Sequence, residues 1–483
     1  MSVSDQTGYR PSWYTATAAR TAERAPLTAD LDVDVCVIGA GLAGLTTARE
    51  IARSGWSVAV LEARRIAWNA SGQNGGFVLP GFAAPASRVV ERVGLAHAKE
   101  LWALSQAGLD YVRATIGEIA TPDIDPVDGW LNVAKLDDPA RTAATLRLLG
   151  EDLGVEVEGW ASERVREVLK TERYFDAVHF PGAFHMHPLN YALGLAALAE
   201  QAGAHIFEHA PAVAIDPGGV RKRIETPQGR LRAAHVVLAG NVHVGELMPQ
   251  LGRTLLPVWS YVAVTAPLGP RLAQAITYYG AVSDGVGPDT HYRVVDGDRL
   301  LVCGRATVWE ADAHALGRGL AADIAGLYPQ LGVVECEHCW SAVLGRTIHD
   351  MPQIGELAPG IWLASGFGGH GCNTTALAGN LVARAIVDGD DTWRLFRPFE
   401  LIWAGGSVGR AAAQIAYWWT RRREAGKARQ GNRHADPIGG APASARWPER
   451  AESHLSLAMR SDASATDAMV LPEAALPAEP HLD

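Results

Sequence analysis

Two glycine-rich stretches, far apart in the chain, contain the residues whose types and spacing point most directly to chemistry. The first, GAGLAG, places Gly39, Gly41 and Gly44 in G-x-G-x-x-G spacing, and the second, SGFGGHGCNTT, covers residues 365–375. Gly39 permits a tight turn, Gly41 lets a pyrophosphate approach the backbone, and Gly44 lets a helix pack closely on a strand. The phosphates of such a ligand lie at the positive end of the helix. The first stretch therefore predicts a dinucleotide site.

The residues around GAGLAG have the pattern of a β-α-β unit. Residues 33–38 are the β-branched, apolar run that is typical of a buried parallel strand. From Leu42 the apolar residues recur with helical spacing, and SVAVLE, which ends in Glu62, supplies a second strand. Glu62 is placed to accept a hydrogen bond from a ribose hydroxyl, and an acidic residue there disfavours the 2′-phosphate of NADP. This context favours dinucleotide binding over a purely structural glycine cluster.

The β-α-β unit alone does not separate NAD from FAD. ASGQNGG follows Glu62 closely, and a second glycine-rich stretch lies near the other end of the chain. An NAD enzyme has no need of a late glycine loop that returns to the first unit, whereas the tricyclic ring of FAD must be held at its far end. The pair of stretches favours FAD.

Composition limits the class of protein. A chain of 483 residues suggests two or three folding units, and its formal net charge of −10 argues against a nucleic-acid partner. The sequence has no signal-peptide pattern and no apolar run of about 18 residues, so we expect a cytoplasmic protein without a membrane span. Its five scattered cysteines include Cys336 and Cys339 in CEHC, without a second ligand pair for zinc. Strand alternation sends these two thiols to opposite faces, as buried small side chains, and no metal site is predicted.

Several stretches together resemble the D-amino-acid-oxidase-like flavoproteins. They are VIGAGLAGLTTA, ARRIAWNASGQNGGFV, HPLNYALGLA and MPQIGELAPGIWLASGFGGHGCNTTALAG. The sequence is most similar to the bacterial γ-glutamylputrescine oxidases in this family, which SWYTATA and YWWTRRRE also resemble. The resemblance covers residues 9–425.

The resemblance implies an α/β protein (α+β overall) with a discontinuous, Rossmann-like FAD-binding domain and an inserted antiparallel-sheet substrate domain. The expected divisions are an arm at 1–30, an FAD-binding domain at 31–85, 185–252 and 341–430, a substrate domain at 86–184 and 253–340, and a tail at 431–483. The tail is rich in Ala, Pro, Glu and Ser and is predicted to be disordered. The aromatic and basic stretch before it is predicted to be a packing helix, with membrane-surface attachment as the alternative.

The resemblance also implies which positions contact FAD, which is expected to be bound non-covalently. The early positions are Gly39, Ala40, Gly41, Leu42, Ala43, Gly44, Glu62, Ala63, Arg64, Ser71, Gly72, Gln73, Asn74 and Gly75. The later positions are Ala212, Val213, Gly240, Gly366, Gly369, His370, Gly371, Asn373 and Thr374. Gln73 stands where the family usually has arginine, which puts one polar contact with the cofactor in doubt.

The second glycine-rich stretch gains a role from this resemblance. Gly366, Gly368, Gly369 and Gly371 would let the backbone lie against the isoalloxazine ring without Cβ collisions. Asn373 and Thr374 are candidate caps of the following helix. The N-terminus of that helix would face the flavin edge that becomes negative on reduction, and His370 could assist.

The family reaction is the dehydrogenation of a carbon–nitrogen bond by hydride transfer to flavin N5, which gives an imine that water hydrolyses. Tyr292 and Arg293 lie in HYRVVDGDRLLVCG, where the family places the strand that faces the flavin. Arg293 suits a substrate carboxylate, although a solvent-facing position is the alternative, and His291 is a weaker candidate. Val343 aligns with the flavin-linked cysteine of related sarcosine oxidases. Val302 aligns near their oxygen-activating lysine, so the sequence does not decide whether oxygen or another compound accepts the electrons.

Three functions remain after the sequence is considered. The first is oxidation of a small-molecule amine of the γ-glutamylputrescine type. The second is an amino- or imino-acid dehydrogenase of the proline or pipecolate kind, in which Arg293 binds the α-carboxylate. The third is a flavin-binding accessory protein with little turnover.

Overall fold

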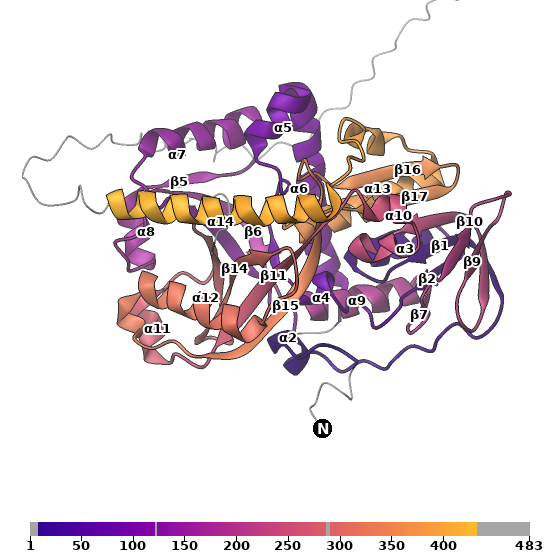
Figure 1. Cartoon of the computed structure of the whole chain (residues 1–483), viewed down its shortest axis with the longest axis horizontal. Coiled ribbons are helices and arrows are strands. Elements are labelled where there is room, and N and C mark those ends of the chain that lie inside the picture. The colour runs from indigo at the N-terminus through magenta and orange to yellow at the C-terminus, as the bar shows by residue number, and fades with distance from the viewer. Residues whose placement is uncertain (1–7, 121–122, 286–289, 432–483) are drawn as a thin grey trace, which may run out of the picture. The chain divides into compact units, whose positions relative to one another are not determined.

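The computed structural model describes residues 8–120, 123–285 and 290–431, and their strands form two sheets (Figure 1). The first sheet has the order β16-β17-β10-β1-β2-β7, with β9 on β10 and β8 on β9. Its strands are β1 (Leu31–Ile38), β2 (Val58–Leu61), β7 (His205–Phe207), β8 (Ala214–Asp216), β9 (Lys222–Glu225), β10 (Arg230–Leu238), β16 (Gln353–Ala358) and β17 (Ile361–Ser365). Parallel β1 lies between β10 and β2, as the predicted β-α-β unit requires.

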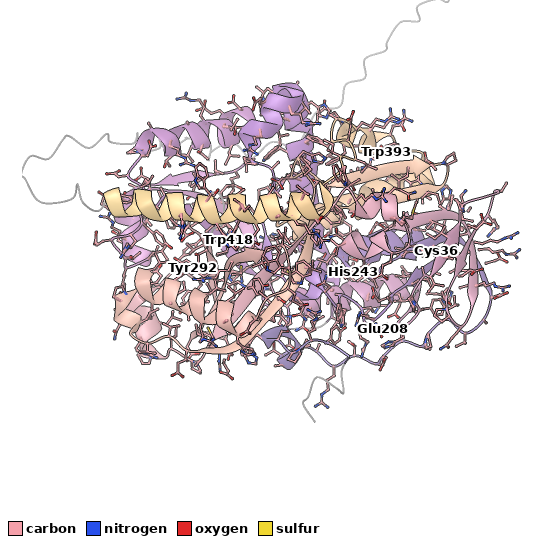
Figure 2. The ribbon with its side chains drawn as sticks, viewed as in Figure 1. Cys36, Glu208, His243, Tyr292, Trp393 and Trp418 are labelled. Atoms are coloured by element: carbon pink, nitrogen blue, oxygen red, sulfur yellow. The ribbon has the colours of Figure 1, made fainter. Side chains whose placement is uncertain are left out.

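The first sheet is buried on both faces because β1 sends alternate apolar side chains to each. Val35 and Val37 belong to a core shared by α3 (Leu42–Arg53), α6 (Leu95–Glu118), α9 (Pro188–Gln201) and α13 (Gly371–Asp388). Cys36, labelled in Figure 2, and Ile38 belong to the core on the opposite face. Helix α6 lies in residues 86–184, which were predicted to belong to the substrate domain, and its buried side chains share a core with those of α13.

The second sheet is mainly antiparallel and has the order β15-β11-β14-β13-β12-β4-β6-β3, with β5 on β6. Its strands are β3 (Phe77–Val78), β4 (Val127–Val133), β5 (Glu158–Trp160), β6 (Ala177–His185), β11 (Leu256–Thr265), β12 (Ala281–Ser283), β13 (His291–Val295), β14 (Arg299–Thr307) and β15 (Cys336–Arg346). One side packs on α11 (Pro270–Ala275) and α12 (Ala313–Leu327). The predicted division differs from the structure at both ends of this sheet, since β3 and most of β15 were assigned to the FAD-binding segments.

Helix α14 (Gly406–Gly431) runs along the second sheet and not along the first, to which residues 341–430 were assigned (Figure 1). The Tyr417 hydroxyl accepts a hydrogen bond from Ala306 N at 3.1 Å, and Gln414 Oε1 accepts one from Val308 N at 3.0 Å. Trp418 points outward and is 54% exposed (Figure 2). Within the described ranges, no helix is long and apolar enough to cross a bilayer. The predicted disordered tail lies outside these ranges, apart from Gly431 at the end of α14.

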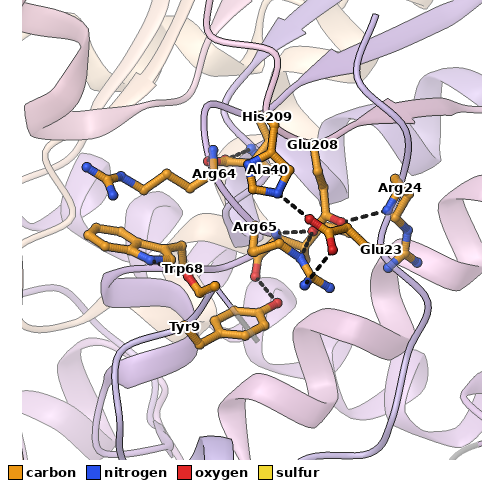
Figure 3. Close-up of polar contacts among 12 residues, drawn as sticks. Tyr9, Glu23, Arg24, Ala40, Arg64, Arg65, Trp68, Glu208 and His209 are labelled. Atoms are coloured by element: carbon orange, nitrogen blue, oxygen red, sulfur yellow. Dashed lines mark hydrogen bonds and ion pairs between the residues drawn. The ribbon is translucent and has the colours of Figure 1, made fainter. Parts of the chain in front are cut away.

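The arm predicted at 1–30 begins, in the described part, at residue 8 and contains α2 (Trp13–Ala16). Buried Glu208 attaches it to the first sheet (Figure 3). One carboxylate oxygen of Glu208 accepts hydrogen bonds from Arg65 Nε at 2.9 Å and Ile66 N at 2.8 Å. The other accepts one from Arg24 N at 2.8 Å, and the Tyr9 hydroxyl donates to Ile66 O at 2.8 Å.

Short helices complete the described chain. The α-helices are α4 (Ala70–Gln73), α5 (Ala86–Val93), α7 (Pro139–Leu146), α8 (Ser162–Val168) and α10 (Pro249–Gly252). The described chain also contains a π-helix, η1 (Arg147–Asp152), and three 3-10 helices, η2 (Asn241–Gly245), η3 (Pro329–Leu331) and η4 (Thr392–Phe396).

Candidate active site

The first glycine-rich stretch forms the tight turn between β1 and α3 that the sequence predicts. Gly39 has φ +108°, a conformation that favours glycine. A Cβ added at Gly44 would lie 2.0 Å from Gly39 O, so only glycine lets α3 approach β1 this closely. Gly41 precedes the helix, and the first helical residue, Leu42, donates its N–H to Ser71 Oγ at 3.0 Å. Gly240 packs against this turn, since a Cβ added at Gly39 would lie 3.0 Å from Gly240 Cα.

Glu62 lies beside this turn, at the end of β2. One carboxylate oxygen accepts a hydrogen bond from Ala40 N at 2.9 Å, and the other accepts one from Arg64 N at 2.9 Å. Burial raises the pKa of Glu62, while these two N–H groups act in the opposite direction. Ala210 N also donates to Glu62 O at 2.8 Å, so the segment that leads to Ala212 and Val213 starts beside Glu62. The backbone N–H of Val213 is already bonded to Glu225 O.

The ASGQNGG segment forms α4 and the loop that follows it. The side chain of Gln73 is buried, and neither its Oε1 nor its Nε2 has a hydrogen-bond partner within the described residues. An unsatisfied buried amide costs about 1–3 kcal/mol, so a polar group of a ligand is expected beside it. The neighbouring Asn74 instead stabilises the loop, donating to Ala70 O at 2.9 Å and accepting from Gly76 N at 2.7 Å. The unpaired amide of Gln73 fits a bound cofactor.

The second glycine-rich stretch meets that loop, as expected for two halves of one site. Cys372 Sγ, in the first turn of α13, lies 3.6 Å from Asn74 Oδ1. Gly366 has φ +72°, and a Cβ added at Gly369 or Gly371 would meet no atom within 4 Å. The backbone therefore faces open space beside the loop that contains Gln73. A flat ring system fits such a surface.

The cap of α13 differs from the prediction. The N-cap residue is His370, and neither Asn373 nor Thr374 caps the helix through its side chain. Asn373 Nδ2 donates to Gly81 O at 3.2 Å, and the Thr374 hydroxyl donates back to His370 O inside the first turn. His370 Nε2 lies 3.2 Å from Leu79 O, and burial lowers the pKa of His370, so its imidazole is neutral.

Arg293 lies on the face of β13 that meets the cofactor loop, but its guanidinium is already bound by the protein. Nε donates to Gly75 O at 3.0 Å, and Nη1 donates to His185 Nδ1 at 2.8 Å. Nη2 donates to the Tyr14 hydroxyl at 3.1 Å and to Met186 O at 3.0 Å. Four of the five N–H groups are thus used. The expectation that Arg293 clamps a carboxylate with two hydrogen bonds disagrees with this arrangement, and so does a solvent-facing position.

Tyr292, labelled in Figure 2, belongs to the core that the second sheet shares with α12. Its hydroxyl is hydrogen-bonded to the Tyr328 hydroxyl at 2.6 Å and donates to the Tyr174 hydroxyl at 3.4 Å, inside the core covered by α12. The prediction of Tyr292 as a catalytic residue is therefore not supported, because successive strand residues face opposite ways.

His291 shares the Arg293 face and forms an aromatic cluster that the sequence analysis did not predict. Its ring centroid lies 5.9 Å from that of Phe77 and 5.8 Å from that of Trp130. Its Nδ1 is buried and has no partner among the described residues. Burial, with a smaller effect of nearby His370, lowers the pKa of His291 to about 4. Trp130 comes from β4, whose pairing with β12 the sequence pattern alone does not reveal.

The fold and the two joined glycine-rich stretches define an FAD-dependent oxidoreductase. The chain matches the family model described as DAO, FAD dependent oxidoreductase, over residues 34–385, and it belongs to this family. The expectations of FAD and of a Rossmann-like domain with a second sheet are thereby confirmed.

Relatives extend over most of the chain. It is 30% identical over 403 residues to the probable oxidoreductase OrdL of Haemophilus influenzae, covering 81% of this chain and 91% of that protein. It is 30% identical over 386 residues to the γ-glutamylputrescine oxidoreductase of Escherichia coli, covering 79% of this chain and 89% of that protein. Glycine oxidase from Geobacillus kaustophilus shares the fold with a TM-score of 0.64 at 24% identity, over 77% of this chain and 99% of that one.

Proposed function

We propose that this protein oxidises a carbon–nitrogen bond of an amine substrate of the γ-glutamylputrescine type, with non-covalently bound FAD. The observation that carries the proposal lies on the face of β13 that meets the cofactor loop, where His291 Nδ1 has no hydrogen-bond partner among the described residues. A relative with 30% identity is a γ-glutamylputrescine oxidoreductase, which supports the choice of an amine.

The residues that would hold FAD follow from the local structure. Gly39, Gly41 and Gly44 would receive the pyrophosphate at the start of α3, and Glu62 would accept the ribose hydroxyl. Ala212 and Val213 would lie near the adenine, and Gln73 would bond a polar edge of the cofactor. When bound, FAD supplies the acceptor for a hydride from the carbon next to the nitrogen.

The remaining positions that the resemblance implies would surround the cofactor from both stretches. From the early segment these are Ala40, Leu42, Ala43, Ala63, Arg64, Ser71, Gly72, Asn74 and Gly75. From the later segments they are Gly240, Gly366, Gly369, His370, Gly371, Asn373 and Thr374. The positive end of α13 would stabilise the flavin edge that gains negative charge on reduction.

His291 would bind and orient the nitrogen of the substrate amine. An amine gives up a hydride readily only when its nitrogen is unprotonated, because the lone pair stabilises the developing imine. The pKa of His291 is lowered to about 4, so its neutral imidazole is too weak a base to deprotonate an alkylammonium, but it can accept a hydrogen bond from the N–H of the unprotonated amine and orient it. Phe77 and Trp130 would cover the apolar part of the substrate and exclude water.

Arg293 separates the two substrate classes that the sequence left open. An α-amino or imino acid calls for a cation that can grip its carboxylate. Arg293 has four of its donors occupied by Gly75, His185, Tyr14 and Met186. This arrangement favours an amine with no carboxylate on the carbon that is oxidised over a proline-type substrate.

Flavin reduction by a substrate panel under anaerobic conditions tests the proposal. We expect γ-glutamylputrescine and related amines to bleach the flavin band faster than proline, pipecolate or glycine. Faster bleaching by the amino acids would favour the second function, and no bleaching by any compound would favour the accessory protein. Reoxidation by oxygen or by a dye then identifies the acceptor. A cytoplasmic location and the absence of a nucleic-acid partner stay predictions.

A further inference from the structure

Cys336 and Cys339 lie on the same side of β15, contrary to the expectation from strand alternation. Where β15 pairs with β11, Val264 lies opposite His338 and Thr265 lies opposite Cys336, so one residue between them, Glu337, has no partner. An extra residue of this kind is a β-bulge, and it resets the alternation of side chains. The alternation rule failed here because the sequence carries no signal for the bulge.

Both thiols lie against the same glycine of α12. Cys336 Sγ is 3.5 Å from Gly317 O, and a Cβ added at Gly317 would lie 2.3 Å from Cys339 Sγ. Both side chains pack against the same core, and both residues are partly exposed. Cys36, Cys303 and Cys372, in contrast, are buried. Glycine at position 317 leaves the space that the pair occupies.

The surroundings make one of the two thiols the better nucleophile. The neighbouring Cys336 thiol lowers the pKa of Cys339, and the nearby cation of Arg318 acts in the same direction. The interaction between the two thiols raises the pKa of Cys336. Thiolates, and not thiols, attack disulfides, so Cys339 attacks first and Cys336 is the resolving partner.

We propose that Cys336 and Cys339 form a reversible dithiol–disulfide site that reacts with oxidised low-molecular-weight thiols. The Cys339 thiolate attacks one sulfur of the small disulfide, forming a mixed disulfide and releasing one small thiolate, which takes up a proton. Cys336 then loses its proton and attacks Cys339 Sγ, forming the protein disulfide and releasing the second small thiol. The protein loses two protons and two electrons, and the small disulfide gains both to become two thiols.

This site is connected to the cofactor loop through β15. Trp340, which follows Cys339 directly, donates its Nε1–H to Gln73 O at 2.9 Å. Three residues later, Val343 N donates to Asn69 Oδ1 at 3.2 Å, and Asn69 Nδ2 donates to Val343 O at 3.0 Å. A disulfide requires the sulfurs to approach to about 2.0 Å, well inside any hydrogen-bond distance. The resulting shift of β15 reaches the loop that contains Gln73, so oxidation changes the flavin environment.

Thiol counting on the intact FAD-bound protein tests the proposal. The reduced protein is incubated with oxidised glutathione, acid-quenched, unfolded and alkylated, and its mass is measured. We expect the number of alkylated cysteines to fall from the five of the chain to three, and dithiothreitol to restore all five. The Cys336→Ser variant should instead accumulate one glutathione on Cys339, because the resolving thiol is missing.

Matched variants and a flavin readout complete the experiment. Cys36→Ala, a change in the buried core of the first sheet, should still lose two alkylatable thiols. Flavin fluorescence of the original protein should change on oxidation and return on reduction, whereas the Cys336→Ser/Cys339→Ser variant should show no change. Five alkylated cysteines after prolonged incubation, or the same loss of thiols in the double variant, would overturn the proposal. A disulfide without a flavin change would overturn the coupling through Trp340.

Discussion

The guanidinium of Arg293 joins three parts of the chain that are far apart in sequence. It reaches the N-terminal arm at Tyr14, the end of β6 at His185 and Met186, and the cofactor loop at Gly75. Its side chain is 5% exposed, so each of these partners would lose a donor without gaining water if the guanidinium were removed. Arg293 acts in this arrangement as a positioning residue.

Arg293→Lys tests that role. Lysine keeps the charge but cannot reproduce the planar arrangement of donors, so several buried acceptors lose their partners. We expect a lower Tm, a loss of about 1–3 kcal/mol for each acceptor left unsatisfied, and weaker FAD binding. The value of kcat/KM should fall by similar factors for a simple amine and for a carboxylate-bearing substrate. A loss confined to carboxylate-bearing substrates would restore the carboxylate clamp.

His291→Leu tests the proposed contact with the substrate amine. The unpartnered Nδ1 has no described hydrogen bond to lose, so FAD content and Tm should stay close to those of the original protein. Loss of a hydrogen-bond acceptor, worth about 0.5–1.5 kcal/mol, should lower kcat/KM by about 2- to 12-fold. The loss should be similar at pH 7 and near pH 10, because His291 does not take the proton of an alkylammonium with a pKa of about 10.4. A loss that disappears near pH 10 would show that His291 acts as a base, and no loss at either pH would contradict the contact.

At the scale of elements, the contact between α3 and β1 depends on the missing side chain of Gly44. Gly44→Ala places a methyl group 2.0 Å from the backbone oxygen of Gly39, which cannot move without opening the turn. We expect a marked fall in Tm and loss of bound FAD, measured by absorbance after gel filtration. Gly117→Ala in α6 is the matched control, because its Cβ meets nothing within 4 Å and alanine favours a helix by about 1 kcal/mol. Equal behaviour of the two variants would contradict the close approach.

Local sequence patterns predicted the elements whose periodicity is regular. The strand–turn–helix around Gly39, the acidic residue at 62 and the strand that ends near Gly240 all lie where expected. Features that depend on pairing between distant strands were missed. The bulge at Glu337 arises from the pairing of β15 with β11, and the aromatic cluster around His291 arises from the contacts of β13 with its neighbours. Strand alternation predicted that Tyr292 and Arg293 lie on opposite faces of β13. It could not predict which of the two residues faces the cofactor loop.

At the scale of the whole molecule, buried histidines determine how stability responds to acid. Burial lowers the pKa values of His185 and His187 to about 3 and of His291 to about 4, against an ordinary value of 6.5. The unfolded chain therefore binds these protons at a higher pH than the folded chain does. Stability contributed by the neutral rings is present above about pH 6.5 and is lost as the pH falls towards 4.

The measurement is the free energy of unfolding of the intact protein from pH 7 to pH 4. Near pH 5 these three residues should add a slope of about 1.4 kcal/mol per pH unit for each proton taken up on unfolding. His185→Gln should keep a donor and an acceptor at this position while removing about one proton from that slope. An unchanged slope in the variant would show that His185 is not held neutral in the folded state.

The contacts of Glu208 and Arg293 also impose an order in time. A ribosome releases the arm first, yet the partners of Arg24 and Tyr14 in the arm are Glu208 and Arg293, which are made much later. The arm cannot make these contacts until residue 293 has been synthesised. The second half of the cofactor site, around Gly369 and Cys372, is synthesised later still. A nascent chain of this protein therefore cannot capture its flavin until about three-quarters of its 483 residues have been joined.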